Sequence, residues 1–288
     1  MKVIVAAAEG GVRRRRRYAL LLAARDSDYV RKVYGGYLEV FIRAFGDDGD
    51  VGDGGGEEWD MFRAVDGELP GADEVDGYDG FVISGSPHDA YADDLWILRL
   101  CLLVRDLVAM RKRLLGICFG HQVATSMQAA ALSGRAGHVN RDVILVVFLS
   151  PRGGWDIGIR EVAMAESLPP YRFLDDALQG ITAAAAPYAK ITEVHQDEVW
   201  ELPAGAEVLA SSSKTGVEMF CAGDRVLGIQ GHPEYTADIL LNLVDRLSSA
   251  GSITMAVAEG VRRQLEDTGP DREFWIKLCK SFLKTEEE

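Results

Sequence analysis

The sequence predicts an α/β fold with a mostly parallel sheet and helices on both faces. Short, continuous apolar runs of strand length recur along the chain, as in strands that are buried on both faces. Longer segments with apolar residues at helical spacing lie between them, and strands that alternate with helices form a largely parallel sheet. The length of 288 residues suits one large domain with a substantial core.

The first half of the chain opens with a predicted strand at 17–24 and a predicted helix at 29–45. Residues 46–58 are almost all glycine or acidic, and we expect a surface loop there. Beyond this loop, hydrophobic periodicity predicts a helix at 93–111 and strands at 59–65, 81–84 and 114–118.

The second half of the chain gives fewer clear secondary-structure signals. Residues 126–154 give strand signals without a clear turn order, so no element is assigned there. Thr236 is predicted to cap a helix with one apolar face, and residues 253–284 form a predicted helical tail. Further strands are predicted at 190–194, 207–210, 217–221 and 225–230. We therefore expect one domain over 17–250, with 251–288 as its helical C-terminal extension.

Composition and charge argue against several classes of protein. With 31 basic and 45 acidic residues, the formal net charge is −14, which disfavours nucleic acid and anionic membrane surfaces as partners. The longest apolar run, 143–149, is too short to span a bilayer. Residues 13–24 imitate the start of a signal peptide, but Arg25 and Asp26 follow with no small-residue cleavage site, so this interpretation is rejected. The four cysteines show no CxxC spacing, which indicates neither zinc nor disulfides and favours a reducing compartment.

The sharpest chemical signal is Gly116-Ile-Cys118-Phe-Gly120, between an apolar strand and a predicted helix. It has the form of a nucleophile elbow, in which flanking glycines permit a tight strand-to-helix turn. The helix N-terminus favours a thiolate over a thiol. A free cysteine is commonly a small buried core residue, so the motif alone leaves both interpretations open.

A thiol nucleophile needs a base, and Gly231-His-Pro-Glu234 supplies one. His232 follows an apolar strand, at the edge where open α/β sheets place their sites. Pro233 favours an extended His232, so that Glu234 can project to the same side and orient the imidazole. Cys118, His232 and Glu234 together form a candidate triad.

The other histidines are weaker candidates. His121 follows Cys118 on the same helical turn and is expected to face solvent or the cleft. His195 is a reserve base or a substrate contact. The main-chain N–H groups of Gly85 or Ser86, together with that of Phe119, could form an oxyanion hole.

Four motifs occur in the order seen in class I glutamine amidotransferase domains, and the chain resembles that superfamily over about residues 17–284. They are Val82-Ile-Ser-Gly-Ser-Pro-His-Asp89, Gly116-Ile-Cys-Phe-Gly-His-Gln122, His195-Gln-Asp-Glu-Val199 and Gly228-Ile-Gln-Gly-His-Pro-Glu-Tyr235. The whole chain, including the tail 270–284, is most similar to the plant γ-glutamyl peptidases of this superfamily. The resemblance implies a flavodoxin-like class I glutaminase fold.

The resemblance also implies an activity. Cys118 would be the nucleophile, His232 the base and Glu234 its orienting partner, in the hydrolysis of γ-glutamyl bonds through a cysteine thioester. The relatives act in the cytosol on glutathione conjugates, on the route to glucosinolates and related sulfur-containing defence compounds. The substrate would be a small molecule, protein partners are not predicted, and no metal or organic cofactor is required.

The side chains that flank the predicted cleft are candidate contacts for the α-amino and α-carboxylate groups of the substrate: Gln122, His195, Gln196 and Asp197. Two other functions remain open. The chain could be a glutaminase subunit that supplies ammonia to a synthetase in trans, or a non-catalytic binding protein on the same fold. The segment 129–153 is longer than the family pattern and includes an unfamiliar run at 140–151, which puts the fold near the cleft in question.

Overall fold

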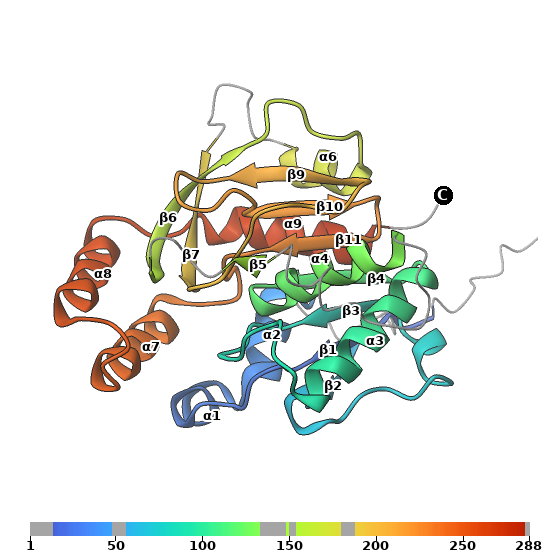
Figure 1. The fold of residues 1–288 in the computed structure, drawn as a ribbon, viewed down its shortest axis with the longest axis horizontal. Coiled ribbons are helices and arrows are strands. Elements are labelled where there is room, and N and C mark those ends of the chain that lie inside the picture. The colour runs from blue at the N-terminus through green and yellow to red at the C-terminus, as the bar shows by residue number, and fades with distance from the viewer. Residues whose placement is uncertain (1–13, 48–55, 133–147, 150–153, 180–187, 286–288) are drawn as a thin grey trace, which may run out of the picture.

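The structure is a computed structural model that describes residues 14–47, 56–132, 148–149, 154–179 and 188–285. Its centre is a nine-stranded sheet in the order β2-β1-β3-β4-β11-β10-β9-β6-β7, shown in Figure 1. A separate two-stranded sheet pairs β5 (Phe148–Leu149) with β8 (Glu198–Val199).

One half of the large sheet is parallel and the other is antiparallel. The five parallel strands are β1 (Arg17–Leu21), β2 (Glu58–Phe62), β3 (Gly80–Ile83), β4 (Arg113–Ile117) and β11 (Val226–Ile229). The sheet continues from β11 through antiparallel neighbours, which are β10 (Met219–Ala222), β9 (Ala206–Ser211), β6 (Asp156–Met164) and β7 (Tyr188–His195).

Helices cover both faces of the sheet, as the sequence predicts. Side chains on a strand point alternately to the two faces, and β1 shows the pattern clearly. Ala19 and Leu21 pack in the cluster that includes α3 (Leu95–Ala109) and α4 (Phe119–Leu132). Tyr18 and Leu20 pack in the opposite cluster, with α2 (Tyr37–Phe45), α6 (Arg172–Leu178) and α9 (Arg272–Lys284). The predicted α/β fold class is therefore confirmed.

Two further helices lie beside the antiparallel half, α7 (Ala237–Ser249) and α8 (Met255–Asp267), as Figure 1 shows. They pack on Ile157 and Ile159 of β6. The short helix α1 (Asp28–Tyr34) joins α7 through Val30 and Ile239. These contacts bring segments from the two ends of the chain together at one side of the sheet.

The predicted helix at 29–45 is wrong in one respect, because the chain forms two helices there. Gly35 and Gly36 adopt φ angles of 91° and 125°, which only glycine tolerates readily, and these residues separate α1 from α2. Thr236 does occupy the N-cap position of α7, but its side chain makes no capping hydrogen bond. Its Oγ1 instead lies 2.9 Å from the Tyr34 hydroxyl.

The structure adds elements that the sequence did not predict. Strand β6 begins just past the segment 126–154, in which the sequence predicts no element, and α6 follows it. Two 3-10 turns lie before β3, at Ala64–Asp66 and Val75–Gly77. The tail at 253–284 is two helices, α8 and α9. Most of the segment 129–153 and of the loop 46–58 lies outside the described residues.

All four cysteines are free and buried. Among the helices that the structure describes, none combines the length and the apolar character that a membrane crossing requires.

Trp275 fixes α9 to the sheet, and its removal should destabilise the protein strongly. The side chain is 1% exposed, and its Nε1–H donates to the Lys190 carbonyl over 3.0 Å. We expect Trp275→Ala to lower the free energy of unfolding by about 3–5 kcal/mol, through the cavity and the lost hydrogen bond. Urea denaturation measures this. Leu95→Ala, at a side chain that is 72% exposed, is the control and should cost less than about 0.5 kcal/mol. A loss below about 1 kcal/mol in Trp275→Ala would contradict the assignment.

Candidate active site

Cys118 lies at the turn between β4 and α4, in a strained backbone conformation. Its φ is 51°, in the left-handed region that costs an L-residue about 1–2 kcal/mol. A Cβ atom at Gly116 would lie 2.4 Å from the Gly120 carbonyl oxygen, and one at Gly120 would lie 2.4 Å from that of Ile83. Both glycines are therefore required for the turn to close against β3, as a nucleophile elbow demands.

Main-chain hydrogen bonds hold this turn in place. The Cys118 N–H donates to the Ile229 carbonyl over 2.9 Å, and the Cys118 carbonyl accepts from the Gln122 N–H over 3.1 Å. The first bond ties the turn to the end of β11, where the chain continues to His232. The side chain of Cys118 is 6% exposed and lines a cleft.

His232 and Glu234 form a buried pair beside Cys118. The His232 Nδ1–H donates to Glu234 Oε1 over 2.9 Å, and the imidazole stacks on Tyr235 with ring centroids 4.2 Å apart. The His232 N–H donates to the Thr192 carbonyl over 2.8 Å, which anchors the residue to β7. The structure thus brings together the three residues that the sequence proposes as a triad.

The surroundings of His232 favour its charged form. Burial by itself disfavours an imidazolium, yet the Glu234 carboxylate and the Cys118 side chain together raise the pKa of His232 well above 6.5. His232 is thereby favoured as an imidazolium beside the Cys118 side chain.

The cleft beside Cys118 has a volume of about 450 Å³. Its lining includes the candidate oxyanion residues Gly85 and Ser86, and His88. Several large apolar side chains also line it: Tyr37 and Phe41 of α2, Leu243 and Leu247 of α7, Trp155 and Tyr235. Arg25 and Arg246 also line it.

The candidate oxyanion residues lie next to the triad. A Cβ atom at Gly85 would lie 2.7 Å from His232 Cε1 and 3.6 Å from the Cys118 Cβ, so this glycine touches both side chains. Phe119 is the first residue of α4, and an N–H at that position has no acceptor within its own helix. Gly85 and the first turn of α4 thus lie beside Cys118, and their N–H groups stay candidates for an oxyanion hole.

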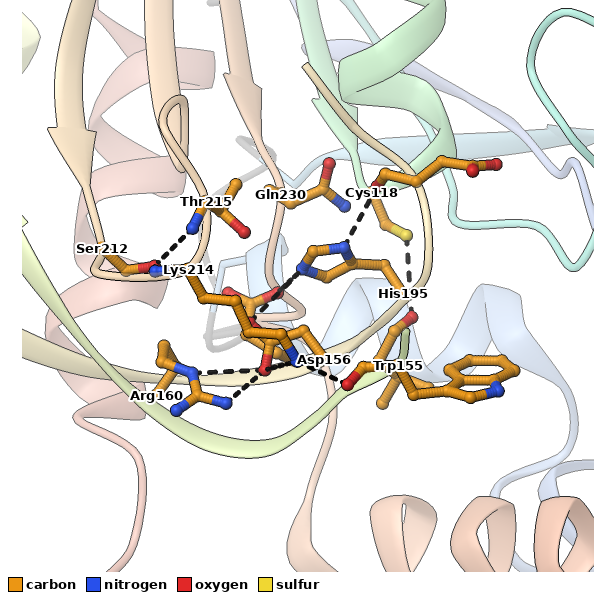
Figure 2. Close-up of polar contacts among 12 residues, drawn as sticks. Cys118, Trp155, Asp156, Arg160, His195, Ser212, Lys214, Thr215 and Gln230 are labelled. Carbon is orange, nitrogen blue, oxygen red and sulfur yellow. Dashed lines mark hydrogen bonds and ion pairs between the residues drawn. The ribbon is translucent and has the colours of Figure 1, made fainter. Parts of the chain in front are cut away.

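The four candidate substrate contacts occupy different environments. Gln122 is buried, and its Nε2 donates to the Asp197 carbonyl over 2.9 Å. Asp197 is half-buried, and burial together with Asp89 raises its pKa to about 6. Gln196 is exposed. None of these four residues lines the cleft. The imidazole of His195, which is 6% exposed, points into a cluster of buried charges that Figure 2 shows.

The expectation for His121 is wrong. Its imidazole is fully buried rather than facing solvent or the cleft, and it lies edge-on to Phe220 with centroids 5.1 Å apart. Burial lowers the pKa of His121 to about 3, so the ring is neutral. It fills the space above Gly228, where a Cβ atom would lie 2.7 Å from its Nδ1. His121 is therefore part of the packing beneath the turn.

Sequence reasoning missed the contribution of β7. The Val194 carbonyl lies 4.0 Å from Cys118 Sγ, and Val194 also lines the cleft with Trp155. A main-chain carbonyl leaves no trace in residue identity, so no sequence signal could have found it. Within the described part of the chain, no three His, Cys, Asp or Glu side chains are grouped as a metal would require.

A family model described as glutamine amidotransferase class-I matches residues 66–239. Gamma-glutamyl peptidase 3 of Arabidopsis thaliana is 42% identical over 267 residues, which cover 93% of this chain and 96% of that protein. Gamma-glutamyl peptidase 5 of the same plant is 41% identical, with 94% and 96% covered. A glutamine amidotransferase structure from Thermotoga maritima superposes with a TM-score of 0.61 at 15% identity, covering 94% of this chain and all of that one, and supports the fold.

The chain therefore belongs to the class I glutamine amidotransferase family. Within this family it is similar over nearly its whole length to proteins named gamma-glutamyl peptidases, and it is accordingly an enzyme of the hydrolase class.

Cys118 should be the one cysteine that reacts readily with iodoacetamide at pH 7. Burial raises the pKa of Cys101 and, with Glu207, that of Cys221 to about 12, and burial also raises that of Cys279, whereas Cys118 opens to the cleft beside His232. Peptide mapping by mass spectrometry would locate the label.

Glu234→Gln supplies the second arm of this experiment. It removes the charge that raises the pKa of His232, so less imidazolium faces Cys118 at pH 7. Alkylation of Cys118 at pH 7 should therefore slow by about tenfold, because a weaker positive charge faces its sulfur atom. Equal labelling of Cys118 and Cys279 in the folded protein would contradict the site.

Proposed function

We propose that this protein hydrolyses γ-glutamyl amide bonds through a thioester on Cys118. The observation that carries the proposal is the buried contact set of Cys118, His232 and Glu234, in a chain 42% identical to a gamma-glutamyl peptidase. A nucleophile, a base and an orienting carboxylate are the three groups that cysteine-dependent acyl transfer needs.

The reaction proceeds in two steps. His232 holds the proton of Cys118, and the thiolate attacks the γ-carbonyl carbon, while N–H groups at Gly85, Ser86 or Phe119 hold the oxyanion. The C–N bond then breaks, and the imidazolium of His232 gives its proton to the departing amine. Water, deprotonated by the same imidazole, attacks the thioester and releases glutamate, which restores the thiol.

The shape of the cleft supports a large leaving group. A volume of about 450 Å³ far exceeds what ammonia requires, and much of the lining is apolar. Arg25 in the lining is paired with Asp66, but Arg246 forms no ion pair with any residue that the structure describes. We assign the apolar lining to the organic substituent of a glutathione conjugate, and Arg246 to the carboxylate at the far end of the leaving peptide.

The substrate class and the cellular setting belong to the same proposal. The substrates are glutathione conjugates on the route to glucosinolates and related sulfur-containing defence compounds, and the protein acts on them in the cytosol. The four free cysteines are consistent with a reducing compartment.

The first test measures glutamate release by mass spectrometry, with a glutathione S-conjugate and with glutamine as separate substrates. We expect release from the conjugate, and a loss of at least about 10³-fold in Cys118→Ala, because the nucleophile is absent. Cys279→Ala is the matched control, since this thiol is buried in the core and should be dispensable for the reaction.

Each other outcome has a clear meaning. Release from glutamine alone would overturn the peptidase proposal in favour of a glutaminase that serves a synthetase in trans. Release from neither substrate would favour a binding protein, and equal release by Cys118→Ala would exclude the thioester.

A second test concerns the leaving group. In Arg246→Gln we expect kcat/KM for a γ-glutamyl dipeptide to fall about tenfold, while the corresponding C-terminal amide is unaffected, because one charge-assisted hydrogen bond contributes about 1.5 kcal/mol. Arg263→Gln, at an exposed arginine on α8 that does not line the cleft, should behave as wild type. An equal loss for acid and amide would show that Arg246 does not bind the carboxylate.

A further inference from the structure

Strand β7 passes directly behind the proposed catalytic residues. Its Thr192 carbonyl accepts the His232 N–H over 2.8 Å, and its Val194 carbonyl lies 4.0 Å from Cys118 Sγ. The side chains of Glu193 and His195 lie on the opposite face of β7 from those of Thr192 and Val194. The position of β7 therefore sets the position of both the base and the nucleophile.

Behind β7 lies a buried charge cluster, which we define as Asp156, Arg160, Glu193, His195, Lys214 and Glu218. Figure 2 shows the His195 ring above Asp156, with Arg160 and Lys214 held at the same carboxylate. Arg160 Nε donates to Asp156 Oδ1 over 3.2 Å, and Lys214 Nζ lies 3.6 Å from the same oxygen. Asp156 is thereby neutralised, whereas Glu193 and Glu218 have no comparable cation.

Glu193 is in contact with the peptide that carries His232. Its side chain is fully buried, and a Cβ atom at Gly231 would lie 2.5 Å from Glu193 Oε1. Its other oxygen, Oε2, lies 3.3 Å from His195 Nε2. As the ring and the carboxyl lie, neither Oε2 nor Nε2 has a hydrogen-bond partner among the described residues, so two buried polar atoms face each other 3.3 Å apart.

The hydrogen bonding of His195 fixes where the proton in this contact must lie. His195 Nδ1 is 3.1 Å from the Asp197 carbonyl, and a carbonyl only accepts, so Nδ1 carries a hydrogen. Burial lowers the pKa of His195, so the ring is neutral and Nε2 presents a lone pair. A carboxylate facing that lone pair would leave two acceptors unpaired in a dry site, whereas a carboxylic acid at Glu193 could donate to Nε2.

We propose that Glu193, as a neutral carboxylic acid bonded to His195, is a positioning residue that holds β7 and the Gly231 peptide in the arrangement that the Cys118 and His232 chemistry requires. It touches neither substrate nor reacting atoms and acts through the main chain. This inference rests on the proposed function for its kinetic consequences, but its effect on stability does not.

The charges around Glu193 determine at what pH its proton is lost. Burial and Asp156 of β6 raise the pKa of Glu193 to about 8, while His232, Glu218 and Arg160 act in the opposite sense. Burial and Glu193 in turn raise the pKa of Glu218 well above its usual value, so it is also neutral. Above about pH 8, Glu193 therefore becomes an anion facing the lone pair of His195, and the contact is lost.

The kinetic test compares Glu193→Gln and Glu193→Leu over pH 6–10. The amide of Gln can donate to His195 Nε2 at every pH. We expect Glu193→Gln to keep kcat at pH 7 within about threefold of wild type, and to move the fall of kcat above pH 8 upward by at least about one unit. Glu193→Leu cannot donate and should lose at least about tenfold in kcat, with KM changed little.

Glu161→Gln is the control, because it removes an exposed carboxyl of β6 that is not part of the cluster. The fall of kcat above pH 8 in this control variant should coincide with that of wild type. If Glu193→Gln keeps the wild-type fall of kcat, or loses as much activity as Glu193→Leu, the proposal is overturned.

A stability measurement decides the question even if no γ-glutamyl substrate is cleaved. A carboxyl whose pKa is raised on folding stabilises the native state below its unfolded pKa, and this stability is lost as the pH rises through the folded value. The difference between the unfolding midpoints of Glu193→Gln and wild type, taken as variant minus wild type, should therefore increase between about pH 5 and 8. Above that range it should stay constant. A gap that is independent of pH would overturn the inference.

Discussion

The close packing of the β4–α4 turn against the end of β3 is the contact on which the rest of the site depends. Cys118 is held at a positive φ because Gly116 and Gly120 approach each other and Ile83 more closely than any Cβ would allow. The strain is local and is maintained by the surrounding sheet. It places the thiol at a helix N-terminus and in the lining of the cleft, so the position of Cys118 follows from the geometry of its backbone.

The two halves of the sheet have different roles. The parallel half ends at β4 and β11, whose C-terminal edges carry Cys118 and lead to His232, as is usual for open α/β sheets. The antiparallel half brings β7 behind these residues, so that its carbonyl groups meet the Cys118 thiol and the His232 N–H. The Glu193 and His195 side chains then connect that strand to the charges on β6. The catalytic pair is thus held from two sides by elements of different topology.

The sequence predicted the parallel half and also β7, β9 and β10 of the antiparallel half, but it did not predict β6. Strands buried on both faces are continuous apolar runs, and β1, β3 and β4 were found within a few residues of their bounds. The sequence does not predict β6 for two reasons. This strand pairs with β9 only near its C-terminal end, and it carries Asp156, Arg160 and Glu161 among its apolar residues. The helix break at Gly35 and Gly36 was also missed, because the apolar spacing continues across it.

By itself, the sequence determined the chemistry that is local along the chain. The glycines around Cys118 and the spacing of His232 and Glu234 act over a few residues, so their geometry could be derived before any tertiary contact was known. Only the tertiary structure decided that His121 is packed in the core and that Glu193 lies against Gly231 and His195. Whether a carboxyl group is charged or neutral depends on burial and on neighbours from distant strands, and these have no signature in the order of the residues.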